Sequence, residues 1–182
     1  MKIKILIPVY NDFQSVSKLI TDINSIILNH IDEFSIIIVN DASKDTVEVD
    51  LKNLDKFKSI KIINMKENRG HARCIATGLK YIFEKEEFDY VIPMDGDGED
   101  RPEEIAKFIE FLKYDQTKPI VGERIKRSEG IIFKLSYSIH KVITFIFTGQ
   151  SIKFGNYTCL PKSTVEKMIN EKATWNSFSG SL

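Results

Sequence analysis

Residues 3–8, Ile-Lys-Ile-Leu-Ile-Pro, and the segment that follows them decide the fold class. The first stretch is short and apolar, as a buried β-strand requires, and the apolar residues after it recur at the three- and four-residue spacing of a helix. These helical positions are Val16, Leu19, Ile20, Ile23, Ile26 and Ile27. The opening of the chain therefore predicts one strand followed by one helix.

The same alternation of strand and helix repeats along the chain. Further strands are predicted at residues 34–39, 60–64, 90–94 and 119–122, and further helices near residues 46–54, 72–83 and 102–112, with Pro102 in the first turn of the last one. Strands that alternate with helices of about 10 to 15 residues are typical of βαβ units. The sequence therefore predicts an α/β fold, a mostly parallel sheet with helices on both faces.

Length and charge limit the functional classes. A chain of 182 residues is long enough for one complete core, and a single domain is expected. Its 26 basic and 26 acidic residues balance, so no overall positive field attracts nucleic acid. An anionic ligand must therefore be held locally.

The two cysteines and the apolar segments indicate a cytoplasmic location. Cys74 and Cys159 form no C-x-x-C pattern and are interpreted as small core residues in a reducing compartment. The chain begins directly with a strand instead of a secretion signal. The most apolar stretch, residues 131–149, contains Lys134, His140 and Lys141, which are costly at the centre of a bilayer. No membrane-spanning segment is predicted.

An acidic loop follows the strand at residues 90–94. Four carboxylates, Asp95, Asp97, Glu99 and Asp100, stand within six residues, where their mutual repulsion favours a cation. Mg²⁺ or Mn²⁺ prefers oxygen ligands and takes one or two protein carboxylates beside substrate phosphates, so Asp95 and Asp97 are the expected ligands. Gly96 and Gly98 would let the backbone turn tightly and a ligand approach.

Two other interpretations of this loop compete with a magnesium or manganese site. An EF-hand calcium loop requires glycine at its sixth position and glutamate at its twelfth, but counting from Asp95 gives Asp100 and Ala106. The calcium loop is therefore excluded. The second alternative, a solvated acidic turn that caps the following helix, stays open, because carboxylates are common at helix N-termini.

Three polar loops, residues 10–12, 40–45 and 95–100, leave the carboxyl ends of predicted strands and should converge on one crevice. Asp41 is the best placed residue of the second loop to bind a base or ribose, although an Asx-type turn or a helix cap would also use it. Tyr10 could stack on a base or close the sheet edge.

Residues 68–73, Asn-Arg-Gly-His-Ala-Arg, open a predicted helix and could receive a phosphate at its N-terminus. Neither G-x-G-x-x-G nor G-x-x-x-x-G-K-[ST] occurs in the chain, which argues against a dinucleotide dehydrogenase and a P-loop nucleotidase. His71 is interpreted as a local hydrogen-bonding residue.

Taken together and in this order, these segments resemble the family 2 glycosyltransferases. Residues 7–11 resemble the opening strand motif of that family, residues 40–45 its base-binding turn, and residues 68–72 its third loop. Asp95-Gly96-Asp97 is similar to its D-x-D metal motif. Residues 98–105 resemble the polyprenyl-phosphate branch, typified by dolichol-phosphate mannose synthase.

The resemblance implies a GT-A fold and inverting transfer of a sugar from a UDP- or GDP-linked donor to a lipid phosphate or a glycan, in the synthesis of cell-envelope glycans. Asp95 and Asp97 would hold Mg²⁺ or Mn²⁺ on the diphosphate, and Asp97 and Asp100 would serve catalysis. The expected donor-binding residues are Pro8, Tyr10, Asn11, Asp41, Ser43, Asn68, Gly70, Arg73, Asp95 and Gly96. Asn40 departs from the acidic residue often found there, which leaves the base open. A nucleotide-sugar-binding module without catalysis and a nucleotidyltransferase are the alternatives.

The last third of the chain is interpreted as the acceptor side, residues 123–182, after a donor-binding part at residues 1–122. Arg124, Lys126 and Arg127 could bind phosphate or form a solvated surface. Residues 131–148 fit either a helix that lies peripherally on the cytoplasmic face of a membrane or a core helix. Residues 163–166 predict a capping box that opens a last helix. Because family members commonly continue further, the resemblance also implies a C-terminally truncated chain.

Overall fold

The computed structural model describes residues 1–44, 54–123 and 154–181. Most of the predicted helix at 46–54, the basic residues Arg124, Lys126 and Arg127, and the predicted amphipathic segment 131–148 lie outside this range. The described elements, in chain order, are β1 Lys2–Val9, α1 Phe13–Ile26, η1 Ile27–Asn29, β2 Glu33–Asn40, β3 Phe57–Asn64, α2 His71–Lys85, β4 Tyr90–Pro93, α3 Glu104–Leu112, β5 Ile120–Glu123, β6 Phe154–Pro161 and α5 Lys162–Asn170.

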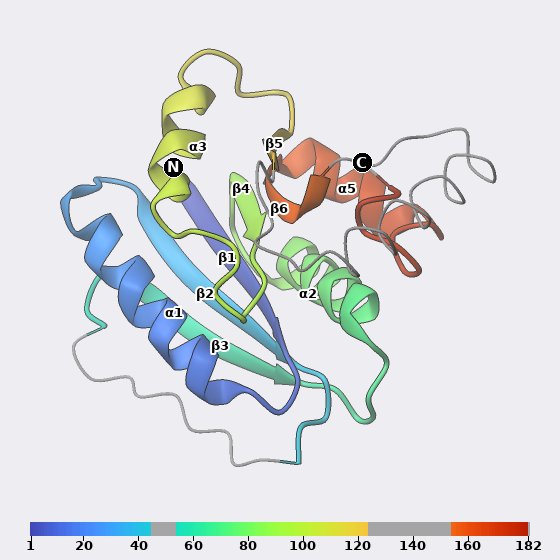
Figure 1. The fold of residues 1–182 in the computed structure, drawn as a ribbon. Helices are drawn as coiled ribbons and strands as arrows, with labels where there is room; N and C mark the ends of the chain where they lie inside the picture. Colours follow the sequence, from blue (N-terminus) through green and yellow to red (C-terminus); the bar gives the residue numbers. More distant parts are fainter. Residues whose placement is uncertain (45–53, 124–153, 182) are drawn as a thin grey trace, which may run out of the picture.

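The strands form one six-stranded sheet in the order β3-β2-β1-β4-β6-β5 (Figure 1). The pairs β1–β2, β2–β3 and β1–β4 are parallel, and β6 runs antiparallel to both β4 and β5. The register pairs Val9 with Asn40 and Asn40 with Asn64, so β1, β2 and β3 end at the same level. The predicted α/β fold with a mostly parallel sheet is confirmed, and the loops after these strands leave from one edge.

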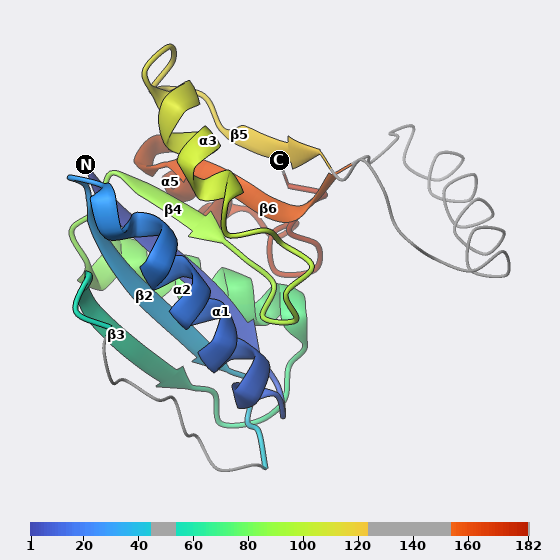
Figure 2. The ribbon, with the colours of Figure 1, turned by 60° about the vertical axis from the view of Figure 1, so that its left-hand side comes forward.

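Helices cover both faces of the sheet, as the alternation predicted. On one face, Ile3, Ile5 and Ile7 of β1 belong to a buried cluster with the apolar residues of α1 and α3. On the other face, Leu6 belongs to a cluster with α2 and α5. Figure 2 shows α1 in front of the sheet and α2 behind it. Every side chain of β1 from Ile3 to Val9 is therefore buried, which explains its nearly continuous apolar sequence.

The starts of α5 and α3 differ from the predicted ones. The predicted capping box at residues 163–166 is wrong, because α5 begins at Lys162 and Ser163 lies inside the helix. The first N–H group of α5, that of Lys162, donates to the backbone oxygen of Asp89 at 3.0 Å, so a tertiary contact replaces the side-chain cap. Pro102 lies in the turn before α3, and the N–H of Ile105 donates to its carbonyl oxygen at 3.0 Å.

Strand β6 was not predicted from the sequence. It contains Gly155 and ends at Pro161, residues that weaken a strand pattern, and its neighbours β4 and β5 come from distant parts of the chain.

Cys74 and Cys159 are free and buried, as expected of core residues. Within the described parts of the chain, no helix combines the length and the apolar character that crossing a bilayer requires.

Ion pairs between lysine and glutamate side chains lie at the amino end of the sheet. The carboxylate of Glu86, at the end of α2, binds the Nζ of buried Lys4 at 3.3 Å and the Nζ of Lys61 at 2.5 Å. Burial alone would raise the pKa of Glu86, but its bonds to Lys61 and Lys4 outweigh burial and lower the pKa. A second pair joins Lys2 to Glu87 beside it. These carboxylates therefore stabilise the fold at the end opposite the loops.

Candidate functional site

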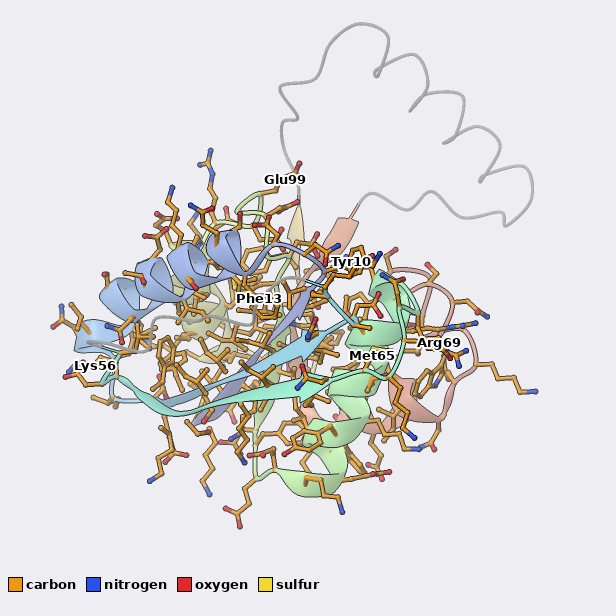
Figure 3. The ribbon with its side chains drawn as sticks, turned by 90° about the horizontal axis from the view of Figure 1, so that it is seen from below. Tyr10, Phe13, Lys56, Met65, Arg69 and Glu99 are labelled. Carbon is orange, nitrogen blue, oxygen red and sulfur yellow. The ribbon has the colours of Figure 1, made fainter. Side chains whose placement is uncertain are left out.

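The carboxyl end of the sheet carries a cavity of about 500 Å³. This volume lies in the range of small-molecule sites. The end of β1 and the loops that follow β1 and β4 contribute most of its wall, and the first turns of α1 and α2 contribute one residue each. Figure 3 shows Tyr10 and Arg69 near the arrowheads of the strands, far from Lys56 at the other end. The lining residues are Pro8, Val9, Tyr10, Asp12, Val16, His71, Asp95, Gly96, Asp97, Asn156 and Ser179.

The loops after β1 and β2 are joined by reciprocal hydrogen bonds. The N–H of Asn11 donates to Ser43 Oγ at 2.9 Å, and the N–H of Lys44 donates to Asn11 Oδ1 at 2.8 Å. Asn11 and Ala42 have positive φ angles, 53° and 56°, in a region that non-glycine residues visit rarely. The first two predicted loops therefore meet, and the contact fixes the backbone beside the exposed Tyr10.

Asp41 at the end of β2 holds the loop that leads into α2. Its side chain is almost fully buried, and its two carboxylate oxygens accept hydrogen bonds from the N–H groups of Arg69 at 2.7 Å and Gly70 at 2.8 Å. Gly70, with φ +86°, makes the turn into the helix. Asp41 does not line the cavity. The structure thus gives Asp41 a loop-holding contact in addition to the nucleoside contact that the resemblance implies.

The acidic loop after β4 is shaped by its own carboxylates. Asp100 is 2% exposed, and its Oδ2 accepts the N–H of Asp95 at 2.8 Å. Asp97 Oδ1 accepts the N–H of Glu99 at 2.9 Å around the turn at Gly98, where φ is +80°. A Cβ on Gly96 would lie 2.9 Å from Val16 Cγ2, so this glycine allows the loop to pack against α1. Asp100 therefore lies behind the cavity wall, whereas Asp95 and Asp97 form part of it.

Asp95 is contacted from two further elements. His71 Nε2, on the first residue of α2, lies 2.9 Å from Asp95 Oδ1, and Asn156 Nδ2, on β6, donates to the same oxygen at 3.3 Å. The hydrogen bond with Asp95 raises the pKa of His71, although burial acts in the opposite direction. The predicted role of His71 as a local hydrogen-bonding residue agrees with this contact, whereas Asn156 was not predicted to belong to the site. Asn156 had no usable signal, because the strand that carries it was not predicted.

The residues of this wall fit a divalent cation that is shared with a bound diphosphate. Among the residues that the structure describes, no three histidines, cysteines or carboxylates gather into a group that could hold a metal unaided. Asp95 and Asp97 nevertheless bring two carboxylates to one cavity. One or two carboxylates are the protein share of a Mg²⁺ site completed by substrate phosphates and water. The donor set therefore suits a cation that arrives with its nucleotide.

The predicted site residues fall into three groups by location. Those that line the cavity are Pro8, Tyr10, Asp95, Gly96 and Asp97. Those that hold the surrounding loops by hydrogen bonds or by a turn are Asn11, Asp41, Ser43, Gly70 and Asp100. Asn68 and Arg73 are exposed and do not line the cavity. The three predicted loops and the start of α2 do converge at the carboxyl end of the sheet.

The sequence profile described as "Glycosyl transferase family 2" matches residues 4–176. A UDP-N-acetylglucosamine–dolichyl-phosphate N-acetylglucosaminyltransferase of Methanococcus voltae is 32% identical over 137 residues, which are 68% of this chain and 52% of the relative. An undecaprenyl-phosphate 4-deoxy-4-formamido-L-arabinose transferase of Proteus mirabilis is 30% identical over 176 residues, which are 93% of this chain and 50% of the relative. The chain spans about half the length of these curated relatives.

Solved structures share the fold at low sequence identity. Residues 1–349 of S. aureus TarS, in complex with UDP-GlcNAc, superpose with a TM-score of 0.59 at 18% identity, covering 92% of this chain and 47% of that one. The mannosyltransferase PcManGT from Pyrobaculum calidifontis, in complex with GDP-Man and Mn²⁺, gives a TM-score of 0.58 at 14% identity, covering 91% of this chain and 46% of that one. The fold is therefore the GT-A fold that the sequence resemblance implied.

Proposed function

Since the chain belongs to the family 2 glycosyltransferases, we propose that it transfers a sugar, with inversion, from a nucleotide-diphospho-sugar to a polyprenyl phosphate. One observation carries the proposal: a single cavity at the carboxyl end of the sheet is bordered by Tyr10 on one loop and by Asp95 and Asp97 on another. An aromatic ring and a pair of carboxylates are the groups that a base and a cation-bound diphosphate require.

The donor is proposed to lie across the ends of β1 and β4. Tyr10 is 48% exposed and offers a ring face on which a base can stack. Gly96 lines the cavity, and its lack of a Cβ lets the loop that carries Asp95 and Asp97 pack against Val16. Asp95 and Asp97 would hold Mg²⁺ or Mn²⁺ against the diphosphate, and such a cation would stabilise the charge of the leaving group as a Lewis acid.

The proposed reaction exchanges one bond at the anomeric carbon for another. An oxygen of the acceptor phosphate forms a bond to that carbon on the face opposite the leaving group, and the bond to the diphosphate oxygen breaks. The nucleoside diphosphate leaves with the electron pair of that bond, and the configuration inverts. A lipid phosphate is already an anion at neutral pH, so the oxygen that attacks has no proton to lose and needs little help from a general base.

A polyprenyl phosphate is proposed as the acceptor because of the names of two relatives. Both relatives described above are named for transfer to a polyprenyl phosphate, dolichyl in one and undecaprenyl in the other. An acceptor of this kind belongs to a membrane, and the reaction is proposed to take place at the cytoplasmic face of that membrane. The contribution of residues 131–148 to membrane contact is proposed from their amphipathic sequence alone. Asp100 is proposed to assist transfer by holding the backbone of Asp95, because its carboxylate is buried behind the cavity.

Calorimetry and product analysis test the proposal together. The chain is titrated with a panel of UDP- and GDP-sugars, in Mn²⁺ and in EDTA, and at least one donor is expected to bind more tightly in Mn²⁺. With donor and polyprenyl phosphate present, free nucleoside diphosphate and a glycosylated lipid are the expected products. Pyrophosphate release would indicate nucleotidyl transfer instead. Absence of metal-dependent binding to every donor would contradict the proposed site.

A further inference from the structure

The position of Asp95 is set by residues on two other elements and by one residue of its own loop. Its Oδ1 lies 2.9 Å from His71 Nε2 at the start of α2 and 3.3 Å from Asn156 Nδ2 on β6. An ionised carboxylate only accepts hydrogen bonds, so the Nε2 of His71 is the donor in this pair. The backbone N–H of Asp95 donates at the same time to the carboxylate of Asp100. The carboxylate is therefore directed by contacts made with both its side chain and its backbone.

His71 is in turn placed by a buried anchor. It follows Gly70, whose φ of +86° turns the chain into α2, and Gly70 has no side chain with which to cap the helix. Asp41, 3% exposed at the end of β2, accepts the N–H groups of Arg69 and Gly70 at 2.7 and 2.8 Å. Paired hydrogen bonds from neighbouring N–H groups to one carboxylate fix the orientation of a peptide segment. The start of α2 is thus tied to the central sheet.

We propose that His71 is a positioning residue: it orients the Asp95 carboxylate toward the cavity, and Asp41 sets the position of His71 through the loop at 69–70. The effect on ligand binding rests on the proposed function, whereas the hydrogen-bonded path from Asp41 to Asp95 can be tested without any ligand. Residues that orient a metal-binding group through a hydrogen bond change metal affinity by about ten- to hundredfold when they are replaced.

The first test measures nucleotide affinity in Mn²⁺ and in EDTA for two substitutions of His71. Glutamine can place an amide donor near the position of Nε2, and leucine cannot. We expect His71→Leu to lose about ten- to hundredfold of the affinity in Mn²⁺ and much less of the affinity in EDTA. His71→Gln should recover most of the Mn²⁺ effect. His30→Gln, on a histidine that packs against Phe34 away from the cavity, is the matched control.

Two results of this test would overturn the positioning role. One is a His71→Leu variant that keeps the full Mn²⁺ effect of the parent. The other is an equal loss of affinity in Mn²⁺ and EDTA, which would mean that His71 acts on the nucleotide or on the fold instead of on Asp95.

The second test uses the ligand-free protein and separates this inference from the proposed function. In ¹⁵N NMR spectra at fixed pH, Asp95→Asn should move the ring Nε2 resonance of His71 and leave that of His30 in place. Asp41→Asn should also move it, because the 69–70 loop loses one acceptor, whereas Asp55→Asn on an exposed turn should not. An unmoved His71 resonance in Asp95→Asn overturns the inference. Should the parent bind no donor in Mn²⁺, the proposed function fails and this second test alone decides the positioning role.

Discussion

At the amino end of the mostly parallel sheet, Glu86 and Glu87 are paired with lysines, whereas at the carboxyl end Asp41 and Asp100 accept hydrogen bonds from backbone N–H groups. Glu86 binds Lys4 and Lys61, and Glu87 binds Lys2. At the other end Asp41 accepts the N–H groups of Arg69 and Gly70, and Asp100 accepts that of Asp95. The same type of side chain therefore performs two tasks in one sheet.

The difference lies in what each contact does with charge. A lysine neutralises its carboxylate, so the amino end is a set of internal ion pairs that stabilise packing. A backbone N–H group carries no net charge, so its hydrogen bond orients a loop and leaves the negative charge of the carboxylate in place. Retained negative charge beside a cavity suits a cation-bound diphosphate. We therefore expect substitutions at the amino end to reduce stability and those at the carboxyl end to reduce binding.

The largest expected loss of stability comes from Glu86→Ala. Removing this carboxylate leaves the buried ammonium of Lys4 without its ion-pair partner, which should lower the free energy of unfolding by about 3 kcal/mol. Urea unfolding followed by circular dichroism measures the change, and donor affinity below the unfolding transition should be unaffected. A normal free energy of unfolding combined with weakened donor binding would reverse the comparison between the two ends.

The pH dependence of stability should carry the signature of the same pair. The pKa of Glu86 in the folded protein is lowered from its ordinary value of 4.5, so the pair stabilises the fold above that value and is lost as the pH falls through the lower, folded-state pKa. As the pH is lowered from about 6 to below the folded-state pKa of Glu86, the Glu86→Gln variant should therefore lose less free energy of unfolding than the unsubstituted protein. Parallel stability curves for the two proteins would show that Glu86 contributes nothing by its charge.

A smaller loss of stability is expected from Asp100→Ala at the carboxyl end. The N–H of Asp95, which is partly buried, loses its acceptor, and this loss should cost about 1 to 2 kcal/mol. Because the N–H group belongs to Asp95, the proposed metal ligand, the affinity for the nucleotide-sugar should fall more in Mn²⁺ than in EDTA. Asp89→Ala, which removes an exposed acceptor of the Lys2 N–H at the amino end, is the matched control and should change stability without changing the Mn²⁺ effect. Equal effects of the two substitutions on binding would contradict the comparison.

The smallest effect is a gain of stability in the loop after β2. Ala42 has a φ of 56°, which is unfavourable for a residue with a Cβ. Ala42→Gly should raise the free energy of unfolding by about 0.5 to 1 kcal/mol, since relief of this strain exceeds the entropy that glycine adds to the unfolded chain. A thermal unfolding series measures the gain, and a loss of stability would show that the loop is not strained.

Hydrophobic periodicity predicted most of the fold because it reports which face of each element is buried. The runs of β1 and β2 and the three- and four-residue spacing of α1 and α2 each specify local structure and burial together. The antiparallel β6 was missed because Gly155 and Pro161 interrupt its pattern, and its place between β4 and β5 depends on contacts far apart in the chain.

The site was predictable in outline for a different reason. In a parallel sheet, loops at the carboxyl ends of the strands leave from one edge, so Tyr10 and Asp95 could be assigned to the same edge from the alternation of strands and helices alone. The hydrogen-bond partners of each carboxylate could not be predicted, because they are far away in the sequence. Asp41 accepts the N–H of Gly70, 29 residues away, and Asn156 donates to Asp95 from a distance of 61 residues along the chain. Side-chain direction at such separations is set by tertiary packing.

The central claim is that Asp95 and Asp97 bind a nucleotide-sugar through a divalent cation. Its most direct test is the difference in donor affinity between Mn²⁺ and EDTA, measured for the parent and for a double variant, Asp95→Asn with Asp97→Asn. We predict that the parent binds more tightly in Mn²⁺, and that the double variant loses this difference while its free energy of unfolding stays within about 1 kcal/mol of the parent. A double variant that retains the full Mn²⁺ effect would contradict the account.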